Sequence, residues 1–514
     1  MPHLSLLVTF TLYFAVLLLA GYLGYRATQN LSDYLLGGRH LGRFVTALAA
    51  GASDMSGWLL MGLPGAIYLS GLSQVWIVIG LVIGAWLNWR CVAGRLRLYT
   101  EQCGNALTLP DYLAQRFRSH RPHLRIVTGL IILIFFACYC ASGMVAGARL
   151  FETVLGISYS TSLWICAFAT MTYVLLGGFL AVSWTDTLQG ILMMGALLIT
   201  PLLAMVAVGG WHKSTVVLLQ HYPTHLNMFH GLSGVTMVSL LAWGLGYFGQ
   251  PHILVRFMAA QSVSVLPAAR RISITWMVLC LIGAVAVGLL GAAYFSVSHN
   301  LSSDLVKVNP ERVFILLSQA LFNPWFGGII LAAVLSAIMS TLSCQLLVCA
   351  SALTQDVYCV LFKQQTSQNA LVWLSRAAVL AVTLIALYLA ATTGSQILSM
   401  VGYAWAGFGA AFGPVVLFSL FWARMTEKGA LAGMLSGALT VFLWRYYSLG
   451  ELYEILPGFL VASFMVVFVS WLDKPPSSQV LESFQLLLKQ PLGIHRSVSK
   501  KVLKSSVPTR SQKI

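Results

Sequence analysis

The run GASDMSGWLLMGLPG at residues 51–65 places an aspartate among glycines and a proline within a long apolar stretch. Glycine lowers helix propensity by about 1 kcal/mol. Backbone that has lost its helical partners is tolerated at membrane depth only where it lines a cavity or is buried in protein. The run therefore predicts a transmembrane helix that is broken near Asp54, a device with which transporters bind ions and substrates at the bilayer midplane. Glycines that allow close helix packing are the alternative, and the acid in the same run favours the break.

The rest of the chain has the composition of a membrane protein. It is 58% hydrophobic and 9% charged over 514 residues, whereas soluble domains are about 45–50% apolar and about 25% charged. At about 20 apolar residues per crossing, we predict an all-α protein with about thirteen membrane spans. The windows are 5–25, 44–71, 75–94, 126–155, 161–181, 185–209, 234–257, 272–296, 325–353, 370–392, 397–422, 429–447 and 455–472. The first window is kept as a span, because residues 1–5 contain no Lys or Arg and no signal cleavage site follows the window.

The net charge of +16 is distributed by membrane side. Basic residues follow the odd-numbered windows: Arg26, Arg39 and Arg43, the arginines of 90–125, Arg256, Arg270 and Arg271, Lys363, Arg424 and Lys428, and the tail from Lys474. The even-numbered gaps hold only Lys213, Lys307 and Arg312. The positive-inside rule then predicts an inner-membrane protein with its N-terminus outside and its C-terminus in the cytoplasm. The charge follows topology, so we expect no nucleic-acid partner.

Two regions divide the chain. Residues 1–472 are predicted to form a transmembrane domain, and residues 473–514 a basic cytoplasmic tail. The tail holds eight Lys or Arg against two acids, so we expect it to be partly disordered and to lie near the membrane surface.

An ion site is the first candidate for chemistry. A charged side chain at the bilayer centre costs at least about 2.5–3.5 kcal/mol, so Asp54 needs a cation or hydrogen-bond donors. In the ninth window, Ala337, Ser340 and Thr341 are spaced i, i+3, i+4 and share one helix face. With carbonyls of Ala52 and Met55 from the broken span, they offer five oxygens to a hard cation such as sodium. The alternatives are that Asp54 is a structural cap and that the hydroxyls bond their own helix.

The seventh window offers an aromatic face. Trp243, Tyr247 and Pro251 fall at i, i+4 and i+8, and residues 244–249 also match G-x-G-x-x-G. A dinucleotide site is excluded because no strand precedes these glycines. Aromatic residues mostly pack in cores, but here they could wall a pocket for a small apolar ring, which Tyr139 and Trp58 could complete.

These segments resemble the sodium/solute symporter family, and within it the bacterial sodium/proline symporters. The resemblance rests on YLLGGRHLGR at 34–43, ASDMSGW at 52–58, WGLGYFGQPHI at 243–253 and AIMSTLSCQLLV at 337–348. It implies a five-plus-five inverted-repeat core over about residues 44–422, with the first and last two spans peripheral. It also implies uptake of L-proline by alternating access, with sodium as the coupling ion and no other cofactor.

The resemblance further implies roles for single residues. Sodium would be held by Ala52, Met55, Ala337, Ser340 and Thr341, with Asp54 in support. Proline would contact Ser56, Gly57, Trp58, Gly62, Tyr139, Trp243, Tyr247 and Pro251. Arg39 and Asp186 match positions linked to coupling.

Other functions remain open at this point. The same transporter could carry another solute, such as pantothenate or a sugar acid, although a sugar pocket should offer more amides and acids. A membrane sensor built on a transporter domain would need a separate signalling chain, because the tail is too short for a kinase. A membrane enzyme is not expected, since no embedded catalytic cluster accompanies Asp54.

Overall fold

The structure, a computed structural model, describes residues 2–27, 36–102, 104–119, 121–298, 301–362, 368–392 and 396–489. Within these residues every named element is a helix, and the single β-bridge joins Leu41 to Ala260. Nine of the described helical stretches are long and apolar enough to cross a membrane. Each predicted window lies largely in helix, so the prediction of an all-α membrane protein is confirmed.

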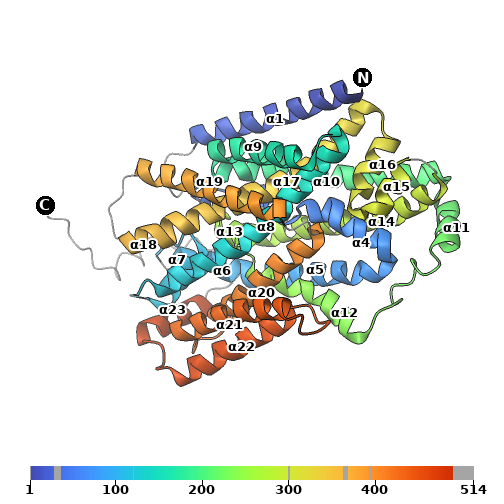
Figure 1. Cartoon of the computed structure of the whole chain (residues 1–514). Coiled ribbons are helices and arrows are strands. Elements are labelled where there is room, and N and C mark those ends of the chain that lie inside the picture. Colours follow the sequence, from blue (N-terminus) through green and yellow to red (C-terminus); the bar gives the residue numbers. More distant parts are fainter. Residues whose placement is uncertain are drawn as a thin grey trace.

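Most of the spans are unbroken helices (Figure 1). They are α1 (Pro2–Ala27), α8 (His123–Leu155), α9 (Tyr159–Gly177), α10 (Phe179–Val208), α14 (Leu266–Val297), α17 (Pro324–Ser351), α19 (Gln368–Thr392), α20 (Ile397–Phe421), α21 (Glu427–Tyr446) and α22 (Ile455–Leu472). The third window continues from α5 (Val75–Leu87) through the π-helical η4 (Asn88–Val92) into α6 (Ala93–Gln102).

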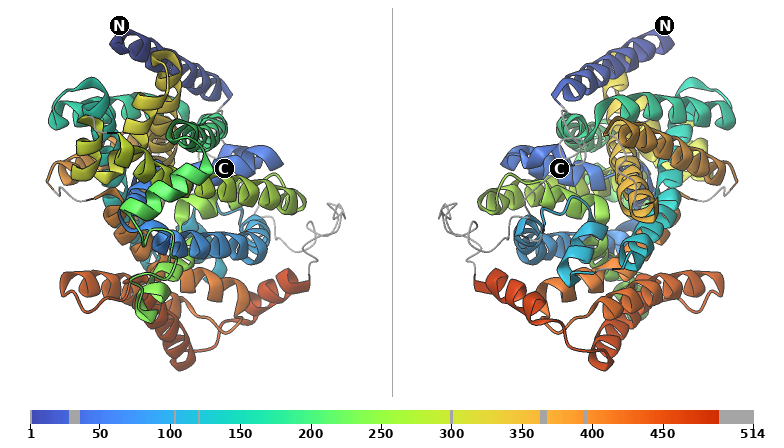
Figure 2. Two further views of the ribbon diagram at one scale, coloured as in Figure 1. Left: turned by 90° about the vertical axis from the view of Figure 1, so that its right-hand side faces the viewer. Right: turned by 90° about the vertical axis from the view of Figure 1, so that its left-hand side faces the viewer.

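Burial separates core helices from peripheral ones. The most apolar window of the helix that begins at Pro324 is 94% buried, against 33% for α1 and 28% for α22. In Figures 1 and 2, α1 lies along one margin of the molecule, and α21 and α22 lie along the opposite one. Helix α17, which carries Ser340 and Thr341, therefore runs through the protein interior, where polar side chains face protein and not lipid.

Two spans are interrupted. The second consists of α3 (Arg43–Asp54), a non-helical step, the π-helical η2 (Trp58–Gly62) and α4 (Leu63–Ser70). The seventh consists of α12 (Gly234–Leu241), the 3₁₀ segment η5 (Ala242–Gly249) and α13 (Pro251–Met258). These breaks fall in spans five windows apart, the corresponding positions of two five-helix repeats. Paired interruptions of this kind mark the binding site in inverted-repeat transporters.

Some boundaries differ from those predicted. The fifth and sixth windows meet at Gly178, whose φ of +76° suits a glycine, and not near residue 183. Apolar residues continue across this junction, so the apolar pattern does not mark the helix boundary there.

Segments predicted as loops also contain short helices: α7 (Leu109–Phe117), α11 (Trp211–His221), α15 (Leu301–Val308), η7 (Pro310–Arg312) and α16 (Val313–Leu321). In the tail, α23 (Ser478–Lys489) buries Phe484 beneath the Arg116 guanidinium, 4.9 Å from the ring centroid. The start of the tail is thus ordered. Residues 490–514, also predicted to be part of a disordered tail, lie outside the described residues.

Candidate functional site

The break in the second span is stabilised by its own side chains. Helix α3 ends at Asp54, the next residue Met55 is non-helical with φ −81° and ψ 82°, and η2 begins at Trp58. The Trp58 indole donates to the Asp54 carbonyl at 3.1 Å, and the Ser56 hydroxyl accepts from the Trp58 amide at 3.4 Å. Ser56 thus acts as a cap for the resumed half-helix, whose N-terminal amide groups and dipole favour an anionic group.

Glycine allows neighbouring helices to approach this break. A Cβ added at Gly57 would lie 2.7 Å from the Cβ of Ala146 on α8. At Gly62 an added Cβ would lie 3.2 Å from the Cβ of Leu398 on α20. Gly57 therefore borders α8 and Gly62 borders α20, and a larger side chain at Gly57 would push α8 away.

Asp54 connects the two interrupted spans. Its side chain is buried, and Oδ2 accepts a hydrogen bond of 2.5 Å from the Tyr247 hydroxyl of η5. The other carboxylate oxygen, Oδ1, has no hydrogen-bond partner among the residues that the structure describes. Asp54 was predicted to support an ion and Tyr247 to contact a substrate, and the structure brings these two side chains into direct contact.

A group of oxygens joins the break to α17. The Ser340 hydroxyl lies 2.8 Å from the Ala52 carbonyl oxygen and 3.1 Å from the Ala337 carbonyl oxygen. Thr341 follows on the same helix, and its buried hydroxyl finds no partner in the described part of the chain. Three of the five predicted ligands are thus brought together by direct contacts. With Thr341 alongside and Met55 at the end of α3, this is an oxygen-rich, water-excluded cluster of the type that hard cations prefer.

The aromatic residues of the seventh span divide between two neighbours. The Trp243 ring stacks on the Tyr453 ring, with 5.2 Å between the ring centroids. The backbone carbonyl of Trp243 accepts a hydrogen bond of 2.7 Å from the Trp405 indole. The Tyr247 ring meets Trp405 edge-on at 5.1 Å. Trp405, on α20, supports both residues and was missed from the sequence. Only its place in a buried apolar window could have suggested a role.

The remaining predicted contacts lie where α8 faces α13. Tyr139 is buried on α8, and its ring meets His252 edge-on at 6.0 Å. The Tyr139 hydroxyl has no hydrogen-bond partner within the described ranges. Pro251 opens α13 directly after the break at Gln250. Tyr139 and Pro251 are therefore held close to one another through His252.

The two residues predicted to affect coupling both bind α13. Arg39 donates to the carbonyl of Met258, at the end of α13, at 2.8 Å and to that of Ala106 at 2.9 Å. Burial, and then the nearby Arg97, lowers the pKa of Arg39 to about 10, so it stays protonated at neutral pH. Neither contact requires a bound ion.

Asp186 on α10 holds the middle of α13. Its Oδ2 pairs with the Arg256 guanidinium at 2.6 Å, and both side chains are fully buried. Arg256 also donates to Ser183 and covers the Phe179 ring at 4.4 Å. Arg256, counted in the sequence analysis among the charges that mark the membrane side, is thus a buried and paired residue of the protein interior, and the side on which it lies stays a prediction.

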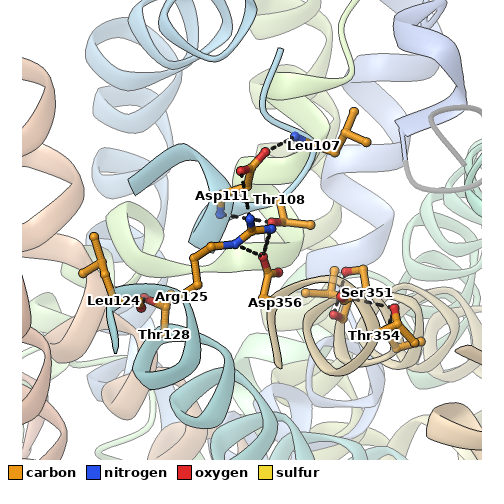
Figure 3. A network of polar contacts seen from close by, with 11 residues as sticks. Leu107, Thr108, Asp111, Leu124, Arg125, Thr128, Ser351, Thr354 and Asp356 are labelled. Carbon is orange, nitrogen blue, oxygen red and sulfur yellow. Dashed lines mark hydrogen bonds and ion pairs between the residues drawn. The ribbon is translucent and has the colours of Figure 1, made fainter. Parts of the chain in front are cut away.

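A second polar network ties the far end of α17 to the rest of the protein (Figure 3). Asp356 lies in η8 (Ala352–Tyr358), which continues α17. Its Oδ1 accepts from Arg125 at 2.9 and 3.0 Å and from the Thr108 hydroxyl at 3.1 Å. Arg125 also reaches Asp111 at 3.6 Å. The helix with the oxygen cluster is thus anchored to α7 and α8 at its other end.

Comparison with known proteins agrees with this geometry. The family model for the sodium:solute symporter family matches residues 34–437. The sodium/proline symporters of Salmonella typhimurium and Escherichia coli are each 57% identical to this chain over 479 residues, covering 93% of it and 95% of the relative. The high-affinity proline transporter PutP of Bacillus subtilis is 52% identical and covers 91% and 98%.

Solved structures share the fold. A sodium-coupled sialic acid symporter matches with a TM-score of 0.76 at 17% identity, over 92% of this chain and 99% of that one. A nucleobase-cation-symport-1 family transporter matches with a TM-score of 0.57 at 14% identity, over 89% and 99%. The family model covers most of the chain, and relatives above half identity cover nearly all of it. The chain therefore belongs to the sodium:solute symporter family.

Proposed function

We propose that this protein is a sodium-coupled secondary transporter that imports L-proline by alternating access. The observation that carries the sodium half is the contact of Ser340 with the Ala52 carbonyl, which joins the interrupted second span to the buried helix α17. The names of the relatives at 52–57% identity support proline over pantothenate or a sugar acid.

Sodium is bound between the second span and α17. The carbonyls of Ala52, Met55 and Ala337 and the hydroxyls of Ser340 and Thr341 supply the ligands. Asp54 is not one of these ligands but supports the ion, since a carboxylate in a low-dielectric interior lowers the energy of a nearby cation. A bound sodium ion would take the place of the hydrogen bond between Ser340 and the Ala52 carbonyl, and it would hold α3 against α17.

Proline is bound beside the sodium site, with its two ends treated differently. The carboxylate is held near Ser56, Gly57 and Trp58 at the start of the resumed half-helix. The ring lies against the aromatic face of the seventh span, formed by Trp243, Tyr247 and Pro251, with Tyr139 and Gly62 completing the pocket.

Coupling between ion and substrate is carried by the Tyr247–Asp54 hydrogen bond. An aspartate that supports the ion is bonded to a tyrosine of the substrate wall, so binding of either ligand fixes a residue that the other needs. By linkage, proline must tighten sodium binding by the same factor by which sodium tightens proline binding. Arg39 and Asp186 contribute by holding α13 and not by touching either ligand.

In the membrane, residues 1–472 form the transporter domain and residues 473–514 its cytoplasmic tail. The N-terminus faces outward. This orientation follows from the basic residues of the 90–125 segment and the tail, which far outnumber the three in the even-numbered gaps.

The test is uptake of labelled L-proline by purified protein in liposomes, with and without an inward sodium gradient. Choline in place of sodium keeps the ionic strength constant. Unlabelled pantothenate and a sugar acid serve as competitors. Sodium-dependent accumulation that only unlabelled proline competes away supports the proposal. Uptake that is independent of the sodium gradient, or that pantothenate abolishes, would overturn the proposed function.

A further inference from the structure

The side chain of Gln250 is fully buried at the break of the seventh span. Gln250 is the residue before α13 and has an extended backbone, with φ −79° and ψ 109°. Residues at this position usually accept a bond from the first turn of the helix, but the Gln250 side chain makes no such bond. Its amide is directed elsewhere.

The orientation of the amide is fixed by its donors. Nε2 lies 3.2 Å from the carbonyl oxygen of Gly246 and 3.2 Å from that of Trp405. A carbonyl can only accept, so both contacts require the amide nitrogen, and the amide cannot be reversed. The opposite atom, Oε1, is buried without a hydrogen-bond partner in the described residues. Buried polar atoms are nearly always bonded, so Oε1 is an acceptor without its donor.

This acceptor belongs to the same scaffold as the aromatic wall. Trp405 accepts from Gln250 through its carbonyl, donates to Trp243 through its indole and meets the Tyr247 ring edge-on. Gln250 is also adjacent to Pro251 in the chain. The amide is thus held rigidly among the residues assigned to the substrate ring.

We propose that Gln250 Oε1 accepts a hydrogen bond from the secondary ammonium group of the substrate and selects cyclic amino acids over carboxylates that lack an N–H. The inference rests on the proposed function. Donors at the break of the second span suit the carboxylate, whereas the ammonium group needs acceptors. Asp54 Oδ1 is another buried acceptor without a partner among the described residues. Because the ammonium carries two N–H groups, Gln250 is tested with Asp54 intact.

The experiment compares two proteins, each with two ligands. Binding to purified wild-type protein and to Gln250→Met is measured at saturating sodium for L-proline and for tetrahydrofuran-2-carboxylate, which keeps the ring and carboxylate but replaces the N–H by oxygen. Wild-type protein should prefer proline, because a site built for an N–H group rejects an analogue that lacks it. Gln250→Met should weaken proline binding about 10- to 100-fold and leave the analogue unchanged.

Asn88 provides the matched control. It is another fully buried amide, its Nδ2 donates to the Tyr247 carbonyl at 3.0 Å, and its Oδ1 also lacks a partner in the described chain. It lies on η4, outside both breaks, so Asn88→Leu should change both ligands equally. If Asn88→Leu lost the preference for proline over the analogue and Gln250→Met kept it, the assignment to Gln250 would be overturned.

The remaining outcomes separate the inference from the function beneath it. Equal loss of both ligands in Gln250→Met would mean that the side chain only holds the break, and the inference fails. If Gln250→Met does not fold, Gln250→Asn takes its place, because it keeps an amide but shortens the side chain by one methylene. The same ratio of proline affinity to analogue affinity is then measured for Gln250→Asn. Wild-type protein that binds no proline at all would overturn the proposed function.

Discussion

Replacing Ser340 by alanine removes one hydroxyl from the centre of the oxygen cluster. In the structure this hydroxyl donates a hydrogen bond of 2.8 Å from α17 to the Ala52 carbonyl of the interrupted second span. The variant leaves that buried carbonyl without its donor and takes one of five oxygens from the ion. A polar contact with a charged group is worth about 1.5–3 kcal/mol, so loss of one ligand oxygen corresponds to about a 10- to 150-fold loss of sodium affinity.

The loss should appear in sodium dependence. We expect Ser340→Ala to raise the sodium concentration for half-maximal proline uptake by at least about 10-fold. Because coupling is reciprocal, the apparent KM for proline should rise at low sodium and recover as sodium saturates. Uptake into proteoliposomes over a matrix of sodium and proline concentrations measures both quantities.

Ser343→Ala is the control for loss of a buried hydroxyl. Ser343 is also fully buried on α17, but its hydroxyl bonds only the Ser340 carbonyl of its own helix, at 3.0 Å. It should leave sodium dependence near that of the wild type. A proline defect in Ser340→Ala that persists unchanged at saturating sodium, or equal sodium shifts in both variants, would refute the assignment of Ser340 to the ion.

Five further variants test other parts of the protein. Asp54→Asn removes the charge but keeps an acceptor for Tyr247, so apparent sodium affinity should fall by at least about 10-fold; wild-type sodium dependence would make Asp54 a structural residue only. Trp243→Ala and Tyr247→Ala remove the aromatic wall, so proline binding at saturating sodium should weaken by about 5- to 150-fold. Sodium binding without proline should stay near normal in Trp243→Ala, because the Trp243 ring stacks on Tyr453 whereas Tyr247 bonds Asp54. Unchanged proline affinity in both would exclude the seventh span from the pocket. Arg125→Gln leaves the fully buried Asp356 carboxylate uncompensated, whereas Asp356→Asn leaves a partly exposed arginine, so Arg125→Gln should lower the melting temperature in detergent more. The reverse order would contradict this account of the network.

The helices were predictable because lipid imposes one simple requirement. A span needs about 20 apolar residues, and this length is visible in the sequence without any knowledge of tertiary contacts. The break near Asp54 was also visible, since glycine weakens a helix locally and a charge at membrane depth requires compensation. The junction at Gly178 was not, because apolar residues continue on both sides of it.

The contacts of the site could not be read in the same way. In a membrane protein the lipid-facing and protein-facing sides of a helix are similarly apolar, so periodicity does not say which face meets which neighbour. The roles of Trp405 and Gln250 depend on hydrogen bonds to carbonyls, which every residue carries and no sequence pattern marks. The pairing of Arg256 was missed for a related reason, since the positive-inside rule counts charges and cannot tell a solvated arginine from one paired with Asp186.

In the proposed mechanism, the position of α13 allows residues outside the two binding sites to affect coupling. Arg39 binds the end of this half-helix, and Asp186 binds Arg256 near its middle. Its first residue, Pro251, adjoins the buried amide of Gln250 and the aromatic segment that reaches Asp54 through Tyr247. A fully buried ion pair has little freedom to adjust in place, because either partner left alone in the interior is strongly destabilised. Any movement of α13 must therefore carry α10 with it or separate Asp186 from Arg256. The two side chains predicted to govern coupling accordingly act on the half-helix that follows the substrate wall, and their replacement should disturb the link between ion and substrate more than the binding of either alone.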